Sequence, residues 1–158
     1  MYFPWDKWEE VPVKYRPTVQ IFVTDRCNHS CPDCFARYAM AERIDMSVER
    51  FKQELDRAGN KGAKQVNLLG GEPTLHPDIN EILDYAVGKM KTTLYTNGAG
   101  LSKVDVTGVT VRLSIRNVDE ISKIKVREPD RYLDITDYTY MVSKHTTLNE
   151  VLAVAKVV

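Results

Sequence analysis

Three cysteines stand close together in the chain, and they are the only cysteines it contains. Cys27, Cys31 and Cys34 follow the spacing CxxxCxxC. Thiolates in such a group bind zinc or an iron–sulfur cluster. A four-iron cluster commonly takes four cysteines, one for each iron, so three would leave one iron open to another ligand. A structural zinc site made from the three cysteines and His29 or another histidine is the alternative.

Two glycines and a glutamate form a second motif. Gly70, Gly71 and Glu72 stand between an apolar run and Pro73. Glycines let the backbone approach a ligand closely. Backbone carbonyls and the carboxylate of Glu72 would suit a positively charged ammonium group, because both are acceptors. An ordinary tight turn between a strand and a helix is the alternative for these residues taken by themselves.

Three polar residues further along the chain are candidates for ligand contacts. Ser114 and Arg116 alternate with Ile115, so both point to the same side of a strand that extends this far. Arg116 would pair there with a carboxylate in a bidentate way, and a surface salt bridge is its alternative role. Asn97 precedes Gly98, and an Asn-Gly pair is by itself a strong turn signal. We therefore expect a structural role for Asn97 near the site rather than direct ligand binding.

Strands and helices must position these residues, and the chain alternates between the two. Short apolar runs of β-forming residues alternate with helical patterns, which is typical of β/α units around a parallel sheet. Strands are predicted at residues 19–24, 65–69, 92–96, 109–115 and 138–143. Helices are predicted from an N-cap at Ser47, from a first turn at Pro77, near residues 119–125 and over residues 147–157. Residues 1–17 are expected to form an extended arm before a single domain at residues 18–158.

The order of motifs and strands predicts where the site lies. Parallel β/α units place their ligand sites at the carboxyl ends of the strands. The cysteines follow the first predicted strand and Gly70 follows the second. Asn97 follows the third strand, and Ser114 and Arg116 end the fourth. All the unusual residues are therefore expected on the same rim of the sheet.

In this order and at these separations, the motifs resemble those of the radical S-adenosylmethionine (SAM) enzyme superfamily. The resemblance covers roughly residues 18–116. It implies an α/β fold, a partial (β/α) TIM-like barrel with a parallel sheet, shortened here to about five β/α units. It also implies two cofactors, a 4Fe-4S cluster and SAM, with the amino and carboxylate groups of SAM on the open iron.

The resemblance also assigns the candidate residues. The cluster would be held by Cys27, Cys31 and Cys34. The amino end of SAM would be held by Gly70, Gly71 and Glu72, and its carboxylate or ribose by Ser114 and Arg116, with Asn97 beside them. The chain departs from the family pattern at Asp33, where an aromatic residue usually precedes the third cysteine.

The activity implied is reductive cleavage of SAM, which gives a 5′-deoxyadenosyl radical that abstracts hydrogen from a small-molecule or macromolecular substrate. An external donor of the flavodoxin or ferredoxin type would supply the electron. One alternative is an activase that installs a glycyl radical on a partner such as anaerobic ribonucleotide reductase. Another is a non-catalytic metal-binding module on a degenerate scaffold, which Asp33 and the short barrel would favour.

Composition limits the other classes of function. The chain has 158 residues, 43% of them hydrophobic and 28% charged, which is ordinary for a globular domain. Its formal net charge is zero, so a broad nucleic-acid surface is not expected. No apolar run fits a signal peptide or a membrane span, so we expect a reducing, cytoplasmic location. A homodimer or a protein partner is expected to cover the open side of so short a barrel.

Overall fold

The computed structural model describes residues 18–32, 34, 36, 44–115, 119–120, 135–140 and 146–155. Several sequence predictions fall outside these residues. They concern the arm at residues 1–17, Asp33, Arg116, most of the helix near residues 119–125, and residues 141–143 of the fifth strand.

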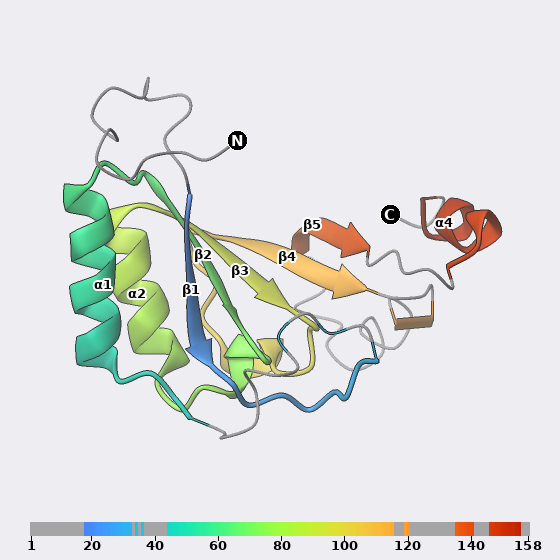
Figure 1. The fold of residues 1–158 in the computed structure, drawn as a ribbon, viewed down its shortest axis with the longest axis horizontal. Helices are drawn as coiled ribbons and strands as arrows, with labels where there is room; N and C mark the ends of the chain where they lie inside the picture. Colours follow the sequence, from blue (N-terminus) through green and yellow to red (C-terminus); the bar gives the residue numbers. More distant parts are fainter. Residues whose placement is uncertain are drawn as a thin grey trace.

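Five strands form one parallel sheet, in the same order in space as in the chain. The strands are β1 (Val19–Thr24), β2 (Gln65–Gly70), β3 (Lys91–Thr96), β4 (Val109–Ile115) and β5 (Ile135–Tyr140). Figure 1 shows them side by side with their arrowheads toward the loops that carry the motifs. This architecture confirms the predicted α/β partial barrel. The fifth strand begins earlier than predicted, at Ile135.

Helix α1 (Val48–Asn60) begins where the sequence predicts. Its N-cap is Ser47, whose hydroxyl oxygen accepts a hydrogen bond from the backbone N–H of Arg50 at 3.2 Å. This bond satisfies one of the backbone donors that have no partner in the first turn of a helix. A short 3-10 turn, η3 (Pro73–Leu75), follows β2.

Helix α2 (Ile79–Lys89) begins later than predicted. Its N-cap is Asp78, so the expectation that Pro77 lies in the first turn was wrong. The ring of His76 accepts the backbone N–H of Asp78 at 3.0 Å, which extends the turn before the helix. Two further elements complete the described chain, η4 (Leu101–Lys103) and α4 (Leu148–Ala155). No helix in the described part of the chain is long and apolar enough to span a bilayer.

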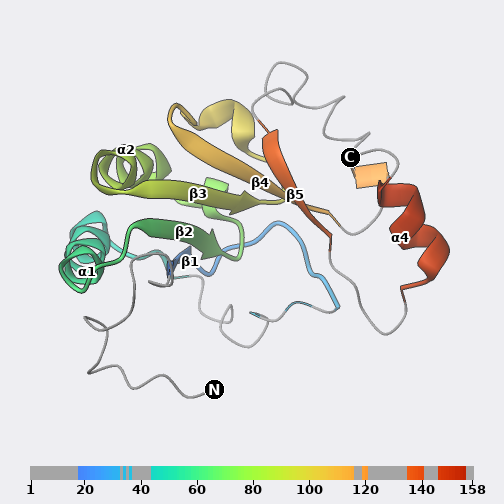
Figure 2. The ribbon, with the colours of Figure 1, turned by 90° about the horizontal axis from the view of Figure 1, so that it is seen from above.

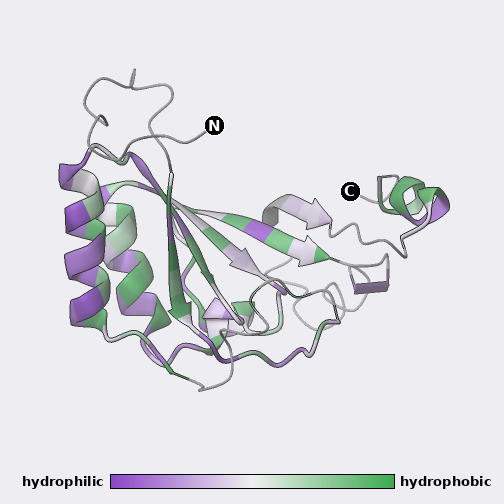
Figure 3. Cartoon of the chain, viewed as in Figure 1, coloured by the Kyte–Doolittle hydropathy of each residue, from purple (hydrophilic) through white to green (hydrophobic). Residues whose placement is uncertain are grey.

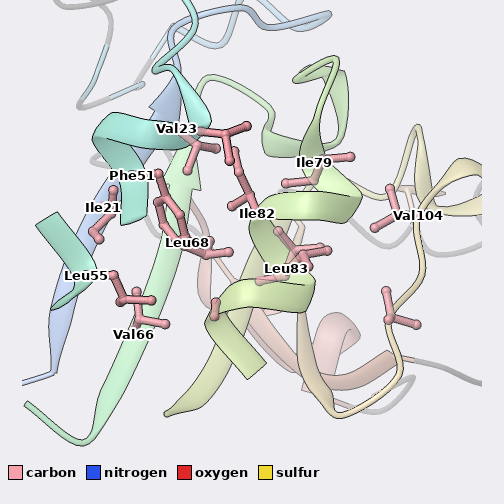
Figure 4. Packing of buried hydrophobic residues seen from close by; sticks show 14 of the residues in the cluster. Ile21, Val23, Phe51, Leu55, Val66, Leu68, Ile79, Ile82, Leu83 and Val104 are labelled. Carbon is pink, nitrogen blue, oxygen red and sulfur yellow. The ribbon is translucent and has the colours of Figure 1, made fainter. Parts of the chain in front are cut away.

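The main hydrophobic core lies between the sheet and the helix pair α1 and α2 (Figure 4). Its fully buried side chains include Phe51, Leu55, Leu68, Ile82, Leu83 and Leu94. Figure 3 shows hydrophobic residues on the sides of α1 and α2 that face the strands, and hydrophilic residues on their outer sides. Seen from above, α4 lies beyond β5, away from this pair (Figure 2). The core therefore holds the sheet rigid without occupying the carboxyl ends of its strands.

Candidate active site

A cavity of about 190 Å³ opens at the carboxyl ends of the strands. The loop after β1 contributes Cys27, His29, Cys31 and Cys34 to its walls, and the end of β2 contributes Leu69, Gly70, Gly71 and Glu72. The end of β3 contributes Tyr95, Thr96 and Asn97, β4 contributes Ser114, and β5 contributes Thr139. Every predicted site residue that the structure describes therefore lines one cavity.

Four of the lining residues were not predicted: Leu69, Tyr95, Thr96 and Thr139. The signal that would have found them is their place in the sheet. Each lies at or next to the carboxyl end of a parallel strand, where parallel β/α units place their ligand sites. Arg116, the predicted partner for a carboxylate, lies outside the described residues.

The three thiols are half-buried and form no disulfide. The backbone N–H of His29 donates to the sulfur of Cys27 at 3.4 Å, and the N–H of Cys34 donates to the carbonyl of Cys31 at 3.3 Å. Hydrogen bonds to sulfur stabilise a ligating thiolate and tune the potential of an iron–sulfur cluster. Within the residues that the structure covers, no three His, Cys, Asp or Glu side chains are grouped closely enough to hold one metal ion.

The two glycines lie directly against the loop that carries the cysteines. A Cβ atom at Gly70 would lie 2.5 Å from the carbonyl oxygen of Thr24, and one at Gly71 would overlap the carbonyl oxygen of Arg26. The backbone N–H of Gly71 donates to the Thr24 carbonyl at 2.8 Å, and that of Glu72 donates to the Arg26 carbonyl at 2.7 Å. Glycine is therefore required here for the packing of two loops, in addition to any approach to a ligand.

Glu72 is a buried carboxylate at the centre of the site, with 1% of its surface exposed. Its Oε1 accepts the backbone N–H of Thr74 at 3.1 Å and the hydroxyls of Thr74 and Thr96 at 2.7 and 2.6 Å. Its Oε2 accepts the backbone N–H of Asn97 at 2.7 Å. Four hydrogen bonds thus compensate the burial of this carboxylate and join the ends of β2 and β3.

Asn97 connects the loop after β3 to the cysteine loop. Its side-chain oxygen accepts the backbone N–H of Ala99 at 3.0 Å, and its side-chain amide donates to the side-chain oxygen of Asn28 at 2.9 Å. Gly98 follows with a φ of +84°, as a turn with left-handed geometry requires. Asn97 therefore joins two of the loops that line the cavity, and its place beside a bound ligand stays a prediction.

The far wall of the cavity comes from β4 and β5. Ser114 is half-buried and lies opposite Thr139 in the register of these strands. On β4 before Ser114, Arg112 donates from Nη1 to the hydroxyl of Tyr95 at 2.6 Å, and its guanidinium lies 5.2 Å from the centre of that ring. This contact orients Tyr95 at the wall of the cavity.

Buried His76 lies outside the cavity and has a packing role. Its Nδ1 accepts the backbone N–H of Asp78, so the proton is on Nε2, which donates to the carbonyl of Met46 at 2.8 Å. Both ring nitrogens are therefore used within the fold, and the bond to Met46 connects the turn before α2 with the segment before α1.

The sheet and the cavity define a partial β/α barrel that presents three cysteines at its rim, and comparison with known proteins identifies its family. The model of the radical SAM superfamily matches residues 21–132, which is more than half of the chain. The chain therefore belongs to the radical SAM superfamily. The cofactors of this superfamily are a 4Fe-4S cluster and SAM. The chemistry of the donor set fits both, because three thiols, one of which accepts an N–H···S bond, line the same cavity as Gly70, Gly71 and Ser114.

The chain is similar to curated proteins with several activities. It is 34% identical over 95 residues to the antilisterial bacteriocin subtilosin biosynthesis protein AlbA of Bacillus subtilis, covering 60% of this chain and 21% of that protein. It is 32% identical over 130 residues to a probable GTP 3′,8-cyclase of Methanothermobacter marburgensis, covering 80% and 41%. The chain thus spans between a fifth and two fifths of the length of these two relatives.

Solved structures show the same fold. Streptococcus suis SuiB bound to the precursor peptide SuiA superposes with a TM-score of 0.65 at 22% sequence identity, covering 88% of this chain and 36% of that one. SuiB bound to S-adenosylmethionine gives a TM-score of 0.62 at the same identity. At this identity the likeness concerns the fold alone.

Proposed function

We propose that this chain binds a 4Fe-4S cluster through Cys27, Cys31 and Cys34 and cleaves SAM reductively to initiate radical chemistry. The observation that carries the proposal is the cavity itself, which is lined by the three thiols, by the Gly70–Glu72 segment and by residues at the ends of β2, β3, β4 and β5. When bound, the cluster supplies one electron, taken from an external donor of the flavodoxin or ferredoxin type. That electron breaks a carbon–sulfur bond of SAM, giving methionine and a 5′-deoxyadenosyl radical that takes a hydrogen atom from the substrate.

The residues around the cavity divide the binding of SAM between them. Backbone carbonyls of the segment from Gly70 to Glu72 accept the ammonium group, because carbonyl oxygens are acceptors. Ser114, near the end of β4, holds the carboxylate or the ribose, and the sequence assigns Arg116 to the same role. The carboxylate of Glu72 already accepts four hydrogen bonds, so its contribution is to hold the segment and Asn97 in place.

The proposal also concerns the class of substrate and the part that covers the cavity during the reaction. The relatives include a protein of bacteriocin biosynthesis and a probable GTP cyclase, so the family likeness does not select between peptide and nucleotide substrates. A substrate radical must be kept from water. We therefore expect a second copy, a protein partner or the substrate itself to cover the cavity, in a reducing compartment such as the cytoplasm.

Cleavage of SAM without substrate tests the proposal directly. The chain is loaded with iron and sulfide under anaerobic conditions, reduced with dithionite and mixed with SAM, and 5′-deoxyadenosine is measured by mass spectrometry. We expect its formation by the wild type and its loss in Cys31→Ala, together with the four-iron absorption spectrum. Ser30→Ala changes an exposed neighbour in the same loop and is expected to keep both.

The other outcomes separate the alternatives. A chain that takes up zinc in place of iron would contradict the proposal and favour a structural module. A loaded four-iron cluster whose spectrum does not change on addition of SAM would also contradict it. Full cluster loading in Cys31→Ala would overturn the assignment of that ligand.

A further inference from the structure

The segment that carries the cysteines begins after Thr24 and ends before Asp45. Its two ends are hydrogen-bonded to each other outside the cavity. Thr24 and Asp45 form an isolated antiparallel bridge. On either side of it, the N–H of Asp25 donates to the carbonyl of Ile44 at 3.0 Å and that of Met46 donates to the carbonyl of Val23 at 2.8 Å. The segment therefore leaves and rejoins the sheet at one point, next to the end of β1.

The carboxylate of Asp45 makes the side-chain contacts between these two ends. Asp45 Oδ1 accepts the hydroxyl of Thr24 at 2.7 Å, and that hydroxyl oxygen in turn accepts the backbone N–H of Arg26 at 3.0 Å. Asp45 Oδ2 forms an ion pair with the guanidinium of Arg26 at 2.8 Å. Thr24 is buried and the Asp45 side chain is 18% exposed, so these charge-assisted bonds are partly shielded from water.

Arg26 is consequently fixed at three points. Its N–H binds Thr24, its carbonyl accepts the N–H of Glu72 at 2.7 Å, and its side chain binds Asp45. Cys27 is the next residue along the chain. The direction in which the chain enters the cysteine loop is therefore set by Thr24 and Asp45, which are not among the residues that line the cavity, together with Glu72, which is.

We infer that Asp45 is a positioning residue for the cluster site: through Thr24 and Arg26 it holds Cys27 in place before any metal is bound. The inference rests on the proposed function only for the identity of the metal group. Because the chain is already held at Arg26, less conformational entropy is lost at Cys27 when the cluster binds.

The reactivity of the thiols in metal-free protein tests this directly. Iodoacetamide alkylation of Cys27, Cys31 and Cys34 is followed by peptide mass spectrometry, one rate for each cysteine. In Asp45→Ala, we expect Cys27 to react about tenfold faster than in the wild type, the change that corresponds to about 1.4 kcal/mol of lost restraint. Unchanged alkylation of Cys27 would overturn the inference.

Two variants at Thr24 test the hydroxyl relay, which is the pair of bonds that the Thr24 hydroxyl makes to Asp45 and to the N–H of Arg26. They also show whether an effect comes from misfolding. Thr24→Val keeps the shape of the side chain and removes both hydroxyl bonds, so it should accelerate alkylation of Cys27. Thr24→Ser keeps the hydroxyl and should restore the wild-type rate. A serine variant that reacts as fast as the valine variant would contradict the relay, because it would assign the effect to packing alone.

Two matched controls remove similar groups far from the loop. Asp56→Ala removes a carboxylate that pairs with Lys89 at 2.9 Å on the helix pair. Thr92→Val removes a buried hydroxyl that donates to the carbonyl of Met90 at 3.0 Å, at the start of β3. Both should leave the alkylation rates unchanged. An equal acceleration in either control would overturn a local role for Asp45.

The reduction potential of the loaded cluster is a further measurement. A change in loop packing alone would not shift this potential up in one variant and down in another. Asp45→Asn leaves the positive charge of Arg26 without its carboxylate, which should raise the potential. Arg26→Met removes that charge and should lower it. Shifts of the same sign in the two variants would contradict the inference.

Failure of the wild type to load a four-iron cluster would instead contradict the proposed function, and the alkylation rates would still decide the role of Asp45.

Discussion

At the scale of single residues, the tightest requirement in the site falls on Gly71. Its backbone N–H donates to the carbonyl of Thr24 at the end of β1, and that of Glu72 donates to the carbonyl of Arg26 in the cysteine loop. Contact this close leaves no room for a side chain at Gly71. The residue that a sequence motif assigns to the cofactor thus also joins the two loops that would hold the cluster and SAM.

Gly71→Ala should therefore impair cluster binding as well as SAM binding. The added methyl overlaps the Arg26 carbonyl, so the cysteine loop must shift, at a cost of about 1–3 kcal/mol in unfolding free energy. Iron and sulfide content after reconstitution and urea unfolding measure the two effects. Gly88→Ala is the matched control, because a methyl group added there in α2 would meet nothing within 4 Å beyond its own stretch of helix. Normal iron content in Gly71→Ala would refute the steric argument.

At the scale of elements, the site depends on how the ends of neighbouring strands are joined. The loops after β2 and β3 are connected by Glu72, whose carboxylate binds Thr74 on one side and Thr96 and Asn97 on the other. The cysteine loop is joined to both, through backbone bonds to Gly71 and Glu72 and through the bond between Asn28 and Asn97. Three separate loops thus act as one hydrogen-bonded unit.

Glu72→Gln should loosen this unit. An amide has one oxygen, whereas the backbone N–H groups of Thr74 and Asn97 bind different oxygens of the carboxylate. One of these donors then faces an NH₂ group, and a buried donor without a partner costs about 1–3 kcal/mol. Urea unfolding should show this loss, and the affinity for SAM should fall with it.

Glu81→Gln is the control for this substitution. Glu81 lies on the surface of α2 and pairs with Lys52 of α1, so its replacement should leave unfolding nearly unchanged. If Glu72→Gln is as stable as this control, the four hydrogen bonds of Glu72 do not hold the two strand ends together.

At the scale of the whole molecule, the core and the site occupy different parts of the sheet. Side chains of α1 and α2 pack against one face (Figure 4), while the cavity lies at the carboxyl ends of the strands. The packing that stabilises the fold therefore does not pass through the cysteines. The cluster is expected to add stability to a domain that is already folded.

Removal of the cluster by a chelator should lower the Tm and leave the secondary structure intact. A group that binds only the folded state adds to its stability, and each 1 kcal/mol lost lowers the Tm by about 2–4 °C in a chain of this size. Thermal unfolding and far-ultraviolet circular dichroism, recorded before and after chelation, measure the two quantities. Loss of the helical signal at 25 °C would show instead that the fold depends on the metal.

The sequence by itself determined the family, the parallel β/α order and most of the cavity wall. Periodicity and capping residues are local signals, which is why Ser47 marks the start of α1 correctly. Topology then brings the cysteines, Gly70–Glu72, Asn97 and Ser114 to the same rim, because the carboxyl ends of parallel strands meet at one edge. The start of α2 was misplaced because a ring nitrogen of His76 extends the preceding turn.

Only the tertiary structure decided what these residues contact. The burial of Glu72 among Thr74, Thr96 and Asn97 joins positions that are 24 and 25 residues apart in the chain. Asp45 reaches Thr24 across 21 residues. Nothing in the local sequence marks such pairs, because hydrogen bonds between distant segments depend on the register and curvature of the sheet. The sequence therefore identified the chemistry, and the fold showed which groups hold it in position.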